Sequence, residues 1–117
     1  METASDVLRA GDVEIRTSDG LVIAGGRVIP MSLREYRLLR ALVQRENRIV
    51  SREDLYRLAW DAALRDGDRS VDVYIHKLRV KLERALPGHA FIHTHFGFGY
   101  RFAQEPAPAL RDATARR

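Results

Sequence analysis

Residues 69–88 read RSVDVYIHKLRVKLERALPG, in which aliphatic residues recur at helical spacing among charged ones. With about 100° of rotation per residue, the α-helical step, the aliphatic residues fall on one narrow stripe. The stripe consists of Val71, Ile75, Leu78 and Leu82. Such a stripe is typical of a helix that packs one face against a core. The segment therefore predicts an amphipathic helix that begins near Ser70 and ends before Pro87-Gly88, which forbids continuation.

The opposite side of this helix carries hydrogen-bond donors and a small apolar group. It holds Val73, His76, Lys77, Val80 and Arg84, with Asp72 and Arg79 on one flank and Tyr74 and Lys81 on the other. In a DNA major groove, lysine can donate to guanine, a carboxylate can accept from cytosine N4, and valine can touch the thymine methyl. These residue types indicate base reading. A solvated helix side fits the same pattern, with Asp72 simply favouring the helix N-terminus.

The segment before this helix begins with a predicted small sheet. Three short apolar or β-branched runs cover residues 13–16, 21–24 and 27–30, and the dipeptides Asp19-Gly20 and Gly25-Gly26 separate them. Dipeptides of this kind form tight hairpin turns. The pattern predicts an antiparallel meander.

Two helix start signals follow the meander. Ser32-Leu33-Arg34-Glu35 is a capping box, with Met31 and Tyr36 spaced as its hydrophobic staple, and Ser51-Arg52-Glu53-Asp54 is the second signal. The residues expected to face the core are Leu39, Leu42 and Val43 in the first helix and Leu55, Leu58 and Ala59 in the second. Residues 60–68 hold four charged groups and predict a loop.

The last predicted element is a β-hairpin. Strand-like runs at Phe91–His95 and Tyr100–Phe102 flank Gly97-Phe98-Gly99. A helix, a short helix, a basic helix and then a hairpin suit helix-turn-helix docking with a wing. The sequence thus predicts an α+β fold, a winged helix-turn-helix with an N-terminal antiparallel sheet, a three-helix core and a C-terminal β-hairpin wing.

Composition limits the function classes. The 117 residues suffice for one domain, which we place at 8–103, with an N-terminal flank at 1–7 and a disordered tail at 104–117. Cysteine is absent, which excludes disulfides, thiolate catalysis and cysteine metal sites. No apolar run approaches the roughly 18 residues of a membrane span, so we expect a cytoplasmic protein with no membrane partner. Residues 69–103 hold six basic and two acidic groups, an excess equal to the net charge of +4, which favours a polyanionic partner.

Several motifs resemble a known family in order and spacing. They are MSLREYRLL at 31–39, VSREDL at 50–55, Trp60, RSVDVYIHKLRVKL at 69–82, IHT at 92–94 and GFGYRF at 97–102. Together they are similar to the DNA-binding effector domain of OmpR/PhoB-type response regulators, over roughly residues 8–103. The resemblance implies four N-terminal strands and a regulator of transcription that binds double-stranded DNA sequence-specifically. The third helix, about residues 70–85, would then lie in the major groove, and the wing on the backbone or in the minor groove.

The resemblance also implies roles for individual residues. Val73, His76 and Lys77 match base-facing positions, and we group Asp72 with them as the candidate acceptor. Residues expected at the DNA backbone are Arg52, Trp60, Arg69, Ser70, Tyr74, Arg79, Lys81, Thr94 and Tyr100. For Trp60, a place in the core is the alternative. The loop after it occupies the position that meets RNA polymerase in this family, and its expected contact residues are Asp61, Leu64, Arg65 and Asp66.

Two departures from the family pattern bear on function. Phe96 stands at the wing tip, where the family usually has an arginine or lysine. Its ring either packs against Phe98 or the sugar edges, or wedges into the minor groove. Family members also usually carry a phosphorylatable receiver domain, for which this chain has no room. The resemblance further implies a monomer in solution that binds direct repeats in tandem, about one helical turn apart.

Other function classes find little support. His89, His93 and His95 invite a zinc or copper site, yet no HExxH pattern or nearby carboxylate supplies a base. No serine lies in a GxSxG elbow. We therefore expect no catalytic residue, no metal and no cofactor. The remaining alternative is a winged-helix protein–protein interaction module without DNA readout, which the basic third helix disfavours.

Overall fold

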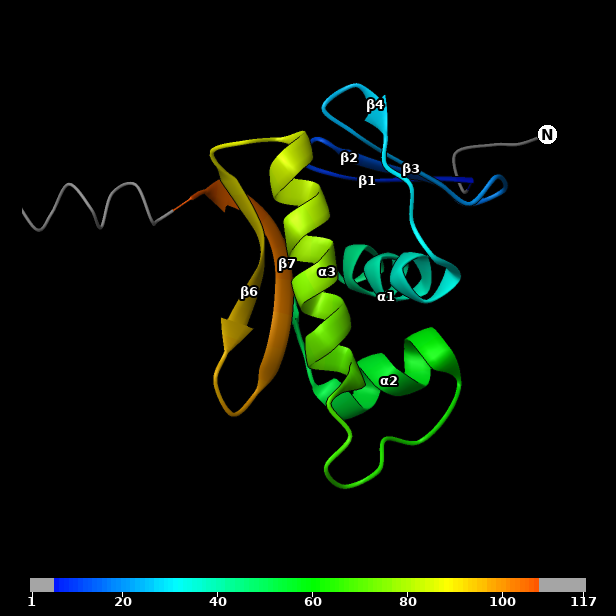
Figure 1. Cartoon of the computed structure of the whole chain (residues 1–117), viewed down its shortest axis with the longest axis vertical. Coiled ribbons are helices and arrows are strands. Elements are labelled where there is room, and N and C mark those ends of the chain that lie inside the picture. Colours follow the sequence, from blue (N-terminus) through cyan, green and yellow to red (C-terminus); the bar gives the residue numbers. More distant parts are fainter. Residues whose placement is uncertain (1–5, 108–117) are drawn as a thin grey trace, which may run out of the picture.

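The N-terminal segment forms a four-stranded antiparallel sheet at one end of the molecule (Figure 1). The computed structural model describes residues 6–107. The strands, in spatial order, are β1 (Val7–Ala10), β2 (Val13–Arg16), β3 (Leu21–Ala24) and β4 (Arg27–Val28). The sheet that the family resemblance implies is therefore present. The residue pattern alone missed β1, which begins one residue before the expected domain boundary at residue 8.

Three helices follow: α1 (Leu33–Gln44), α2 (Arg52–Trp60) and α3 (Ser70–Ala85). The predicted capping box of α1 is confirmed, since the Ser32 hydroxyl accepts from the Glu35 amide at 3.2 Å and the Glu35 carboxylate accepts from the Ser32 amide at 2.8 Å. Ser51 caps α2 with its hydroxyl alone, which accepts from the Asp54 amide at 3.1 Å. The sequence predicted that Trp60 begins the loop. In the structure Trp60 is instead the last residue of α2.

A second sheet holds the wing against the helices. It consists of β5 (Ile49–Val50), β7 (Gly99–Pro106) and β6 (His89–His95), in that spatial order, with antiparallel pairing. Gly99 has φ +138°, and a Cβ at this position would collide with the Val50 carbonyl oxygen. Glycine at the start of β7 therefore allows the wing to lie against β5, directly before α2.

Strand β7 extends farther than the sequence predicted. Its end at Pro106 means that residues 104–106 belong to the sheet and not to the tail. Antiparallel pairing with β6 accounts for this, since His89 pairs with Pro106 and Ala90 with Glu105. The Gln104 side chain also accepts from the Asp12 amide at 2.6 Å and donates to the Asp12 carboxylate at 2.8 Å. These bonds join the end of the wing to the turn between β1 and β2. Residues 108–117 of the predicted tail and 1–5 of the N-terminal flank lie outside the described residues.

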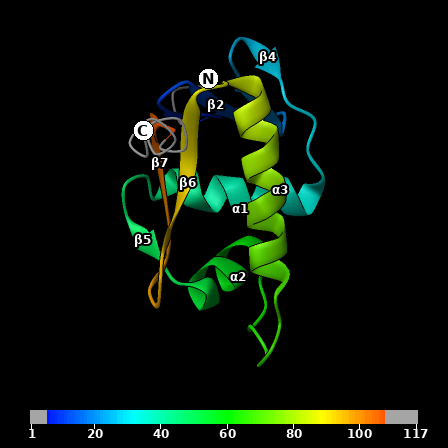
Figure 2. The same cartoon turned by 60° about the vertical axis from the view of Figure 1, so that its left-hand side comes forward.

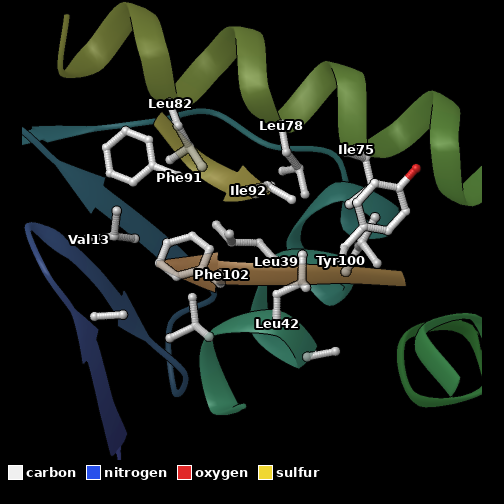
Figure 3. Close-up of a cluster of buried hydrophobic side chains, with 14 of the residues drawn as sticks. Val13, Leu39, Leu42, Ile75, Leu78, Leu82, Phe91, Ile92, Tyr100 and Phe102 are labelled. Carbon is white, nitrogen blue, oxygen red and sulfur yellow. The ribbon is translucent and has the colours of Figure 1, made fainter. Parts of the chain in front are cut away.

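The core lies where α1, α3 and the two sheets meet (Figure 3). The predicted stripe of α3 is confirmed: Val71, Ile75, Leu78 and Leu82 are each at most 1% exposed. Leu39, Leu42 and Val43 of α1 are also buried, as expected. The prediction that Leu58 of α2 faces the core is wrong, because Leu58 is 40% exposed. Of the three α2 residues expected to face the core, only Leu55 and Ala59 are buried. Figures 1 and 2 show α3 lying beside β6 in both views, so this helix and the wing are neighbours.

Candidate nucleic-acid interface

The outward face of α3 offers free side chains. Val73 is 50% exposed, and His76 and Lys77 are also exposed, opposite the buried stripe. The Lys77 ammonium lies 5.2 Å from the centroid of the Tyr74 ring. Within residues 6–107, neither His76 nor Lys77 forms a side-chain hydrogen bond or ion pair. Three of the four residues expected to face bases are thus available to a ligand.

The fourth, Asp72, is held within the protein. Its carboxylate accepts from Arg52 Nε at 2.8 Å and from the Tyr100 hydroxyl, and its second oxygen lies 3.5 Å from Arg69 Nη1. Burial opposes ionisation of Asp72, but the hydrogen bonds from Arg52 and Tyr100 outweigh it, so the pKa of Asp72 lies below its ordinary value. Burial, followed by the hydrogen bond to Asp72, raises the pKa of Tyr100. Asp72 therefore joins α2, α3 and β7 instead of presenting a free acceptor as predicted.

Arg79 fixes the wing to α3. Its guanidinium donates twice to the Ile92 carbonyl, at 2.9 and 2.7 Å, and once to the Thr94 hydroxyl, at 2.8 Å. The same group lies 5.8 Å from the ring centroid of Tyr100. The sequence assigned all three polar side chains, Arg79, Thr94 and Tyr100, to the DNA backbone. In the structure they form hydrogen bonds inside the protein, which link α3 to the wing.

Lys81 also differs from its expected place. Its ammonium donates to the Pro30 carbonyl at 2.8 Å and to Glu35 at 2.7 Å. Glu35 is 5% exposed, and although burial alone would raise the pKa of Glu35, Lys81 and the Ser32 amide lower it below its ordinary value. Lys81 thus neutralises the buried carboxylate of the capping box, and its ammonium is not free to meet a phosphate.

Trp60 belongs to an aromatic cluster on the other flank of α3. Its indole Nε1 donates to the Arg34 carbonyl at 3.2 Å, and its ring packs edge-on against Tyr56 and Tyr74 with centroids 5.0 and 5.4 Å away. The alternative that Trp60 packs with the core fits this arrangement better than the phosphate donor does.

Sequence reasoning missed Arg34, whose guanidinium lies 4.0 Å from the Trp60 ring centroid and 5.4 Å from that of Tyr74. Arg34 is exposed and adds a cation to the flank that carries Lys77. No sequence signal marks it, because its aromatic partners lie 26 and 40 positions farther along the chain.

The loop before α3 is the first of two exposed segments near the outward face of this helix, and the wing tip is the second. Residues 61–69 form the predicted loop, with Asp61, Arg65 and Asp66 exposed and Leu64 half-buried. The side chain of Arg69 is 76% exposed. Ser70 donates its amide to the Asp68 carboxylate at 2.8 Å and its hydroxyl to the same oxygen, so Ser70 starts α3 instead of being free for DNA. These bonds, the hydroxyl one first, lower the pKa of Asp68.

The wing tip is apolar and open. Phe96 is 89% exposed and Phe98 is 73% exposed. Among residues 6–107 no aromatic pair includes either ring. Packing of Phe96 against the Phe98 ring, one part of the first interpretation, is therefore not what the structure has. Contact with the sugar edges stays a prediction. A hollow between the tip and the start of α2 is lined by both rings and by Arg52, Thr94 and Tyr100.

The fold and these motifs match a known family. Residues 26–102 match the family described as "Transcriptional regulatory protein, C terminal". The chain belongs to this family. Its members are DNA-binding regulatory domains and not enzymes, and the winged-helix fold is of the OmpR/PhoB type that the sequence predicted.

Individual proteins that are similar to this chain are response regulators or their DNA-binding domains. Response regulator SaeR of Staphylococcus aureus is 34% identical over 82 residues, which are 70% of this chain and 36% of SaeR. The chain thus spans about a third of the length of this curated relative. The DNA-binding domain of CpxR from E. coli superposes with a TM-score of 0.75 at 27% identity, over 83% of this chain and 95% of that one. The Klebsiella pneumoniae RstA DNA-binding domain in complex with RstA box gives 0.73 at 29% identity, over 83% and 96%.

Residues 6–107 hold neither a metal-binding cluster nor a membrane-spanning helix. Among residues 6–107, no three His, Asp or Glu side chains are grouped as a metal site requires. His93 Nε2 instead lies 2.7 Å from the Ala103 carbonyl oxygen, inside the wing sheet. No helix in this described part of the chain combines the length and the apolar character needed to cross a membrane.

Proposed function

We propose that this domain binds double-stranded DNA sequence-specifically and regulates transcription, with α3 in the major groove. The observation that carries the proposal is the free, exposed face of Val73, His76 and Lys77, opposite a buried stripe on the same helix. The family match and the DNA complex of the similar RstA domain support it.

Base reading falls to three side chains in this proposal. The Lys77 ammonium donates to guanine N7 and O6, His76 donates or accepts beside it, and Val73 touches a thymine methyl. Asp72 does not read cytosine, because Arg52 and Tyr100 already occupy its carboxylate. Its role is to position the helix relative to α2 and the wing.

Phosphate contacts fix the register of the domain on the duplex. Arg52 uses only Nε on Asp72, and its side chain remains 45% exposed, so its terminal nitrogens are available to a phosphate. Arg69 is more exposed still, and Arg34 supplies a cation on the opposite flank of α3. The Thr94 hydroxyl only accepts from Arg79, so it can still donate to a phosphate where the wing approaches the backbone. Tyr74 contributes where the helix does.

Assembly follows from the geometry of successive sites. Domains that bind in tandem present their recognition helices to one side of the duplex when direct repeats lie about one turn, or 10–10.5 base pairs, apart. We propose that the domain is monomeric in solution and occupies such repeats. The loop that carries Asp61, Leu64, Arg65 and Asp66 then projects from the DNA-bound domain and meets RNA polymerase.

A selection followed by a salt series tests the proposal. Duplexes are enriched from a randomised library with the wild-type chain, and the affinity for an enriched duplex is compared with that for a scrambled one. We expect tighter binding of the enriched duplex, with log K falling linearly against log salt. Failure to enrich any sequence, or equal affinity for both duplexes, would overturn specific readout and leave a protein-interaction module.

A further inference from the structure

The most exposed large apolar side chains of the described residues lie together at one place, the wing tip. Phe96 is 89% exposed and Phe98 is 73% exposed, whereas every other large apolar side chain of residues 6–107 is at most 61% exposed. Phe96-Gly97-Phe98-Gly99 contains no charged group. Such a cluster lowers solubility, and an exposed apolar patch on a folded domain commonly marks an interaction site.

The tip is presented rigidly. Gly97 has φ +82° at the turn, which favours glycine, and the Phe98 amide donates to the His95 carbonyl at 2.8 Å to close it. Farther down the wing, Arg79 ties β6 to α3 through the Ile92 carbonyl and Thr94. The backbone that carries the two rings is therefore held relative to the exposed face of α3.

The tip is also continuous with the proposed phosphate contacts. The hollow beneath the two rings is lined by Arg52, Glu53 and Thr94. Arg52 is bonded to Asp72 on α3. A duplex that places a phosphate at Arg52 while α3 occupies the major groove brings the adjacent minor groove to the wing. Apolar wedges at that position unstack base steps and kink the duplex toward the major groove in other minor-groove binders.

We infer that Phe96 and Phe98 form an apolar minor-groove contact that bends the DNA. The inference rests on the proposed function and extends it, because it assigns the wing a contribution from apolar burial and not from charge. A neutral contact releases no counterions, so it adds affinity without steepening the dependence on salt. We assign DNA, and not a second copy of the chain, as the occupant of the tip, because the tip adjoins Arg52, the proposed phosphate contact.

The test uses a duplex enriched by the wild-type chain, cut to a single site. Its bend is measured by energy transfer between dyes at the two ends, and its affinity by gel shift across a salt series. The double variant Phe96→Ala with Phe98→Ala is expected to bind about tenfold more weakly, equal to about 1.4 kcal/mol. It leaves the salt slope unchanged and loses the bend. Val28→Ala, which truncates a side chain 54% exposed in the N-terminal sheet, is the matched control and changes neither quantity.

A second variant, Phe96→Arg, separates charge from shape. It is expected to bind the duplex more tightly than the double alanine variant does, because the arginine adds a charge contact. It should also increase the salt slope by about one and leave the DNA straighter than the wild type does. Because both rings are exposed, the variants keep the melting temperature of the wild type, which circular dichroism checks.

Three results would overturn the inference. Unchanged bend and affinity in the double alanine variant exclude a DNA contact. A loss that appears only on duplexes with two repeats, and not on the single site, assigns the rings to a contact between neighbouring copies. Absence of specific binding by the wild-type chain itself refutes the proposed function, and is thereby distinguished from failure of the wing inference alone.

Discussion

Asp72→Asn removes the charge at the junction of α2, α3 and β7 while keeping the shape of the side chain. The carboxylate accepts from Arg52 Nε at 2.8 Å and from the Tyr100 hydroxyl, and it is 25% exposed. A charge-assisted hydrogen bond that is shielded from water contributes about 1.5–3 kcal/mol, and an exposed ion pair about 0–1 kcal/mol. With Arg52 45% exposed, we expect the free energy of unfolding at pH 7 to fall by about 1–2 kcal/mol.

The pH dependence identifies the charge as the cause. The pKa of Asp72 is lower in the folded protein than in the unfolded chain, so its stabilisation is present above the unfolded pKa of about 3.9 and is lost as the pH falls through the folded pKa. Urea unfolding of both proteins, measured at pH 7 and at successive values below about pH 4, should show the difference shrinking toward zero. Asp66→Asn, in the exposed loop, is the control.

The same variant distinguishes positioning from base reading. If Asp72 only positions the helix, Asp72→Asn weakens binding to the enriched duplex and to all its single-base variants by a common factor. The reasoning is refuted if stability at pH 7 is unchanged, or if the variant alters preference at one base pair only, as a cytosine contact would.

Three other predictions address the interface and its assembly. Arg52→Ala should weaken binding to all sequences alike and reduce the salt slope by about one; an unchanged slope in the gel-shift series removes Arg52 from the phosphate contacts. Trp60→Ala should lower the free energy of unfolding by about 2 kcal/mol, since its half-buried ring packs against Tyr56 and Tyr74; an unchanged melting curve with weakened DNA binding would restore its assignment as a phosphate donor. Inserting about 5 base pairs, half a turn, between two repeats should abolish cooperative binding, and enrichment of a strict inverted repeat in the selection would contradict tandem assembly.

The parts of the fold set by local pattern could be predicted from sequence. The stripe of α3 and the capping box of α1 depend on residues within a few positions of one another, so periodicity and spacing identify them. Strand β1 could not be found from residue pattern, because its sequence VLRA is too short to alternate and only pairing with β2 completes it. The prediction that Leu58 faces the core was wrong for a related reason. On a nine-residue helix the apolar stripe alone does not show how much of the helix a neighbouring element covers.

The polar contacts of the candidate interface were harder to predict. Arg52 and Tyr100 lie 20 and 28 positions from Asp72, and Glu35 lies 46 positions from Lys81. A family motif identifies such residues as belonging to the binding face, yet it does not say which of them bond to one another. As a result the sequence assigned Asp72, Arg79 and Lys81 directly to DNA, whereas in the structure they hold the elements that present Val73, His76 and Lys77.

The central claim is that the exposed face of α3 reads base sequence, and Lys77→Ala tests it most directly. Affinities of the variant and the wild type are measured by gel shift at one salt concentration, on the enriched duplex and on a scrambled duplex of equal length. We expect a loss of about 1–3 kcal/mol on the enriched duplex and a much smaller loss on the scrambled one. Arg9→Ala, which removes an equal charge from the N-terminal sheet where the side chain is 70% exposed, should leave both affinities nearly unchanged. Equal losses on the two duplexes with Lys77→Ala would show that Lys77 touches only phosphate and would contradict the claim.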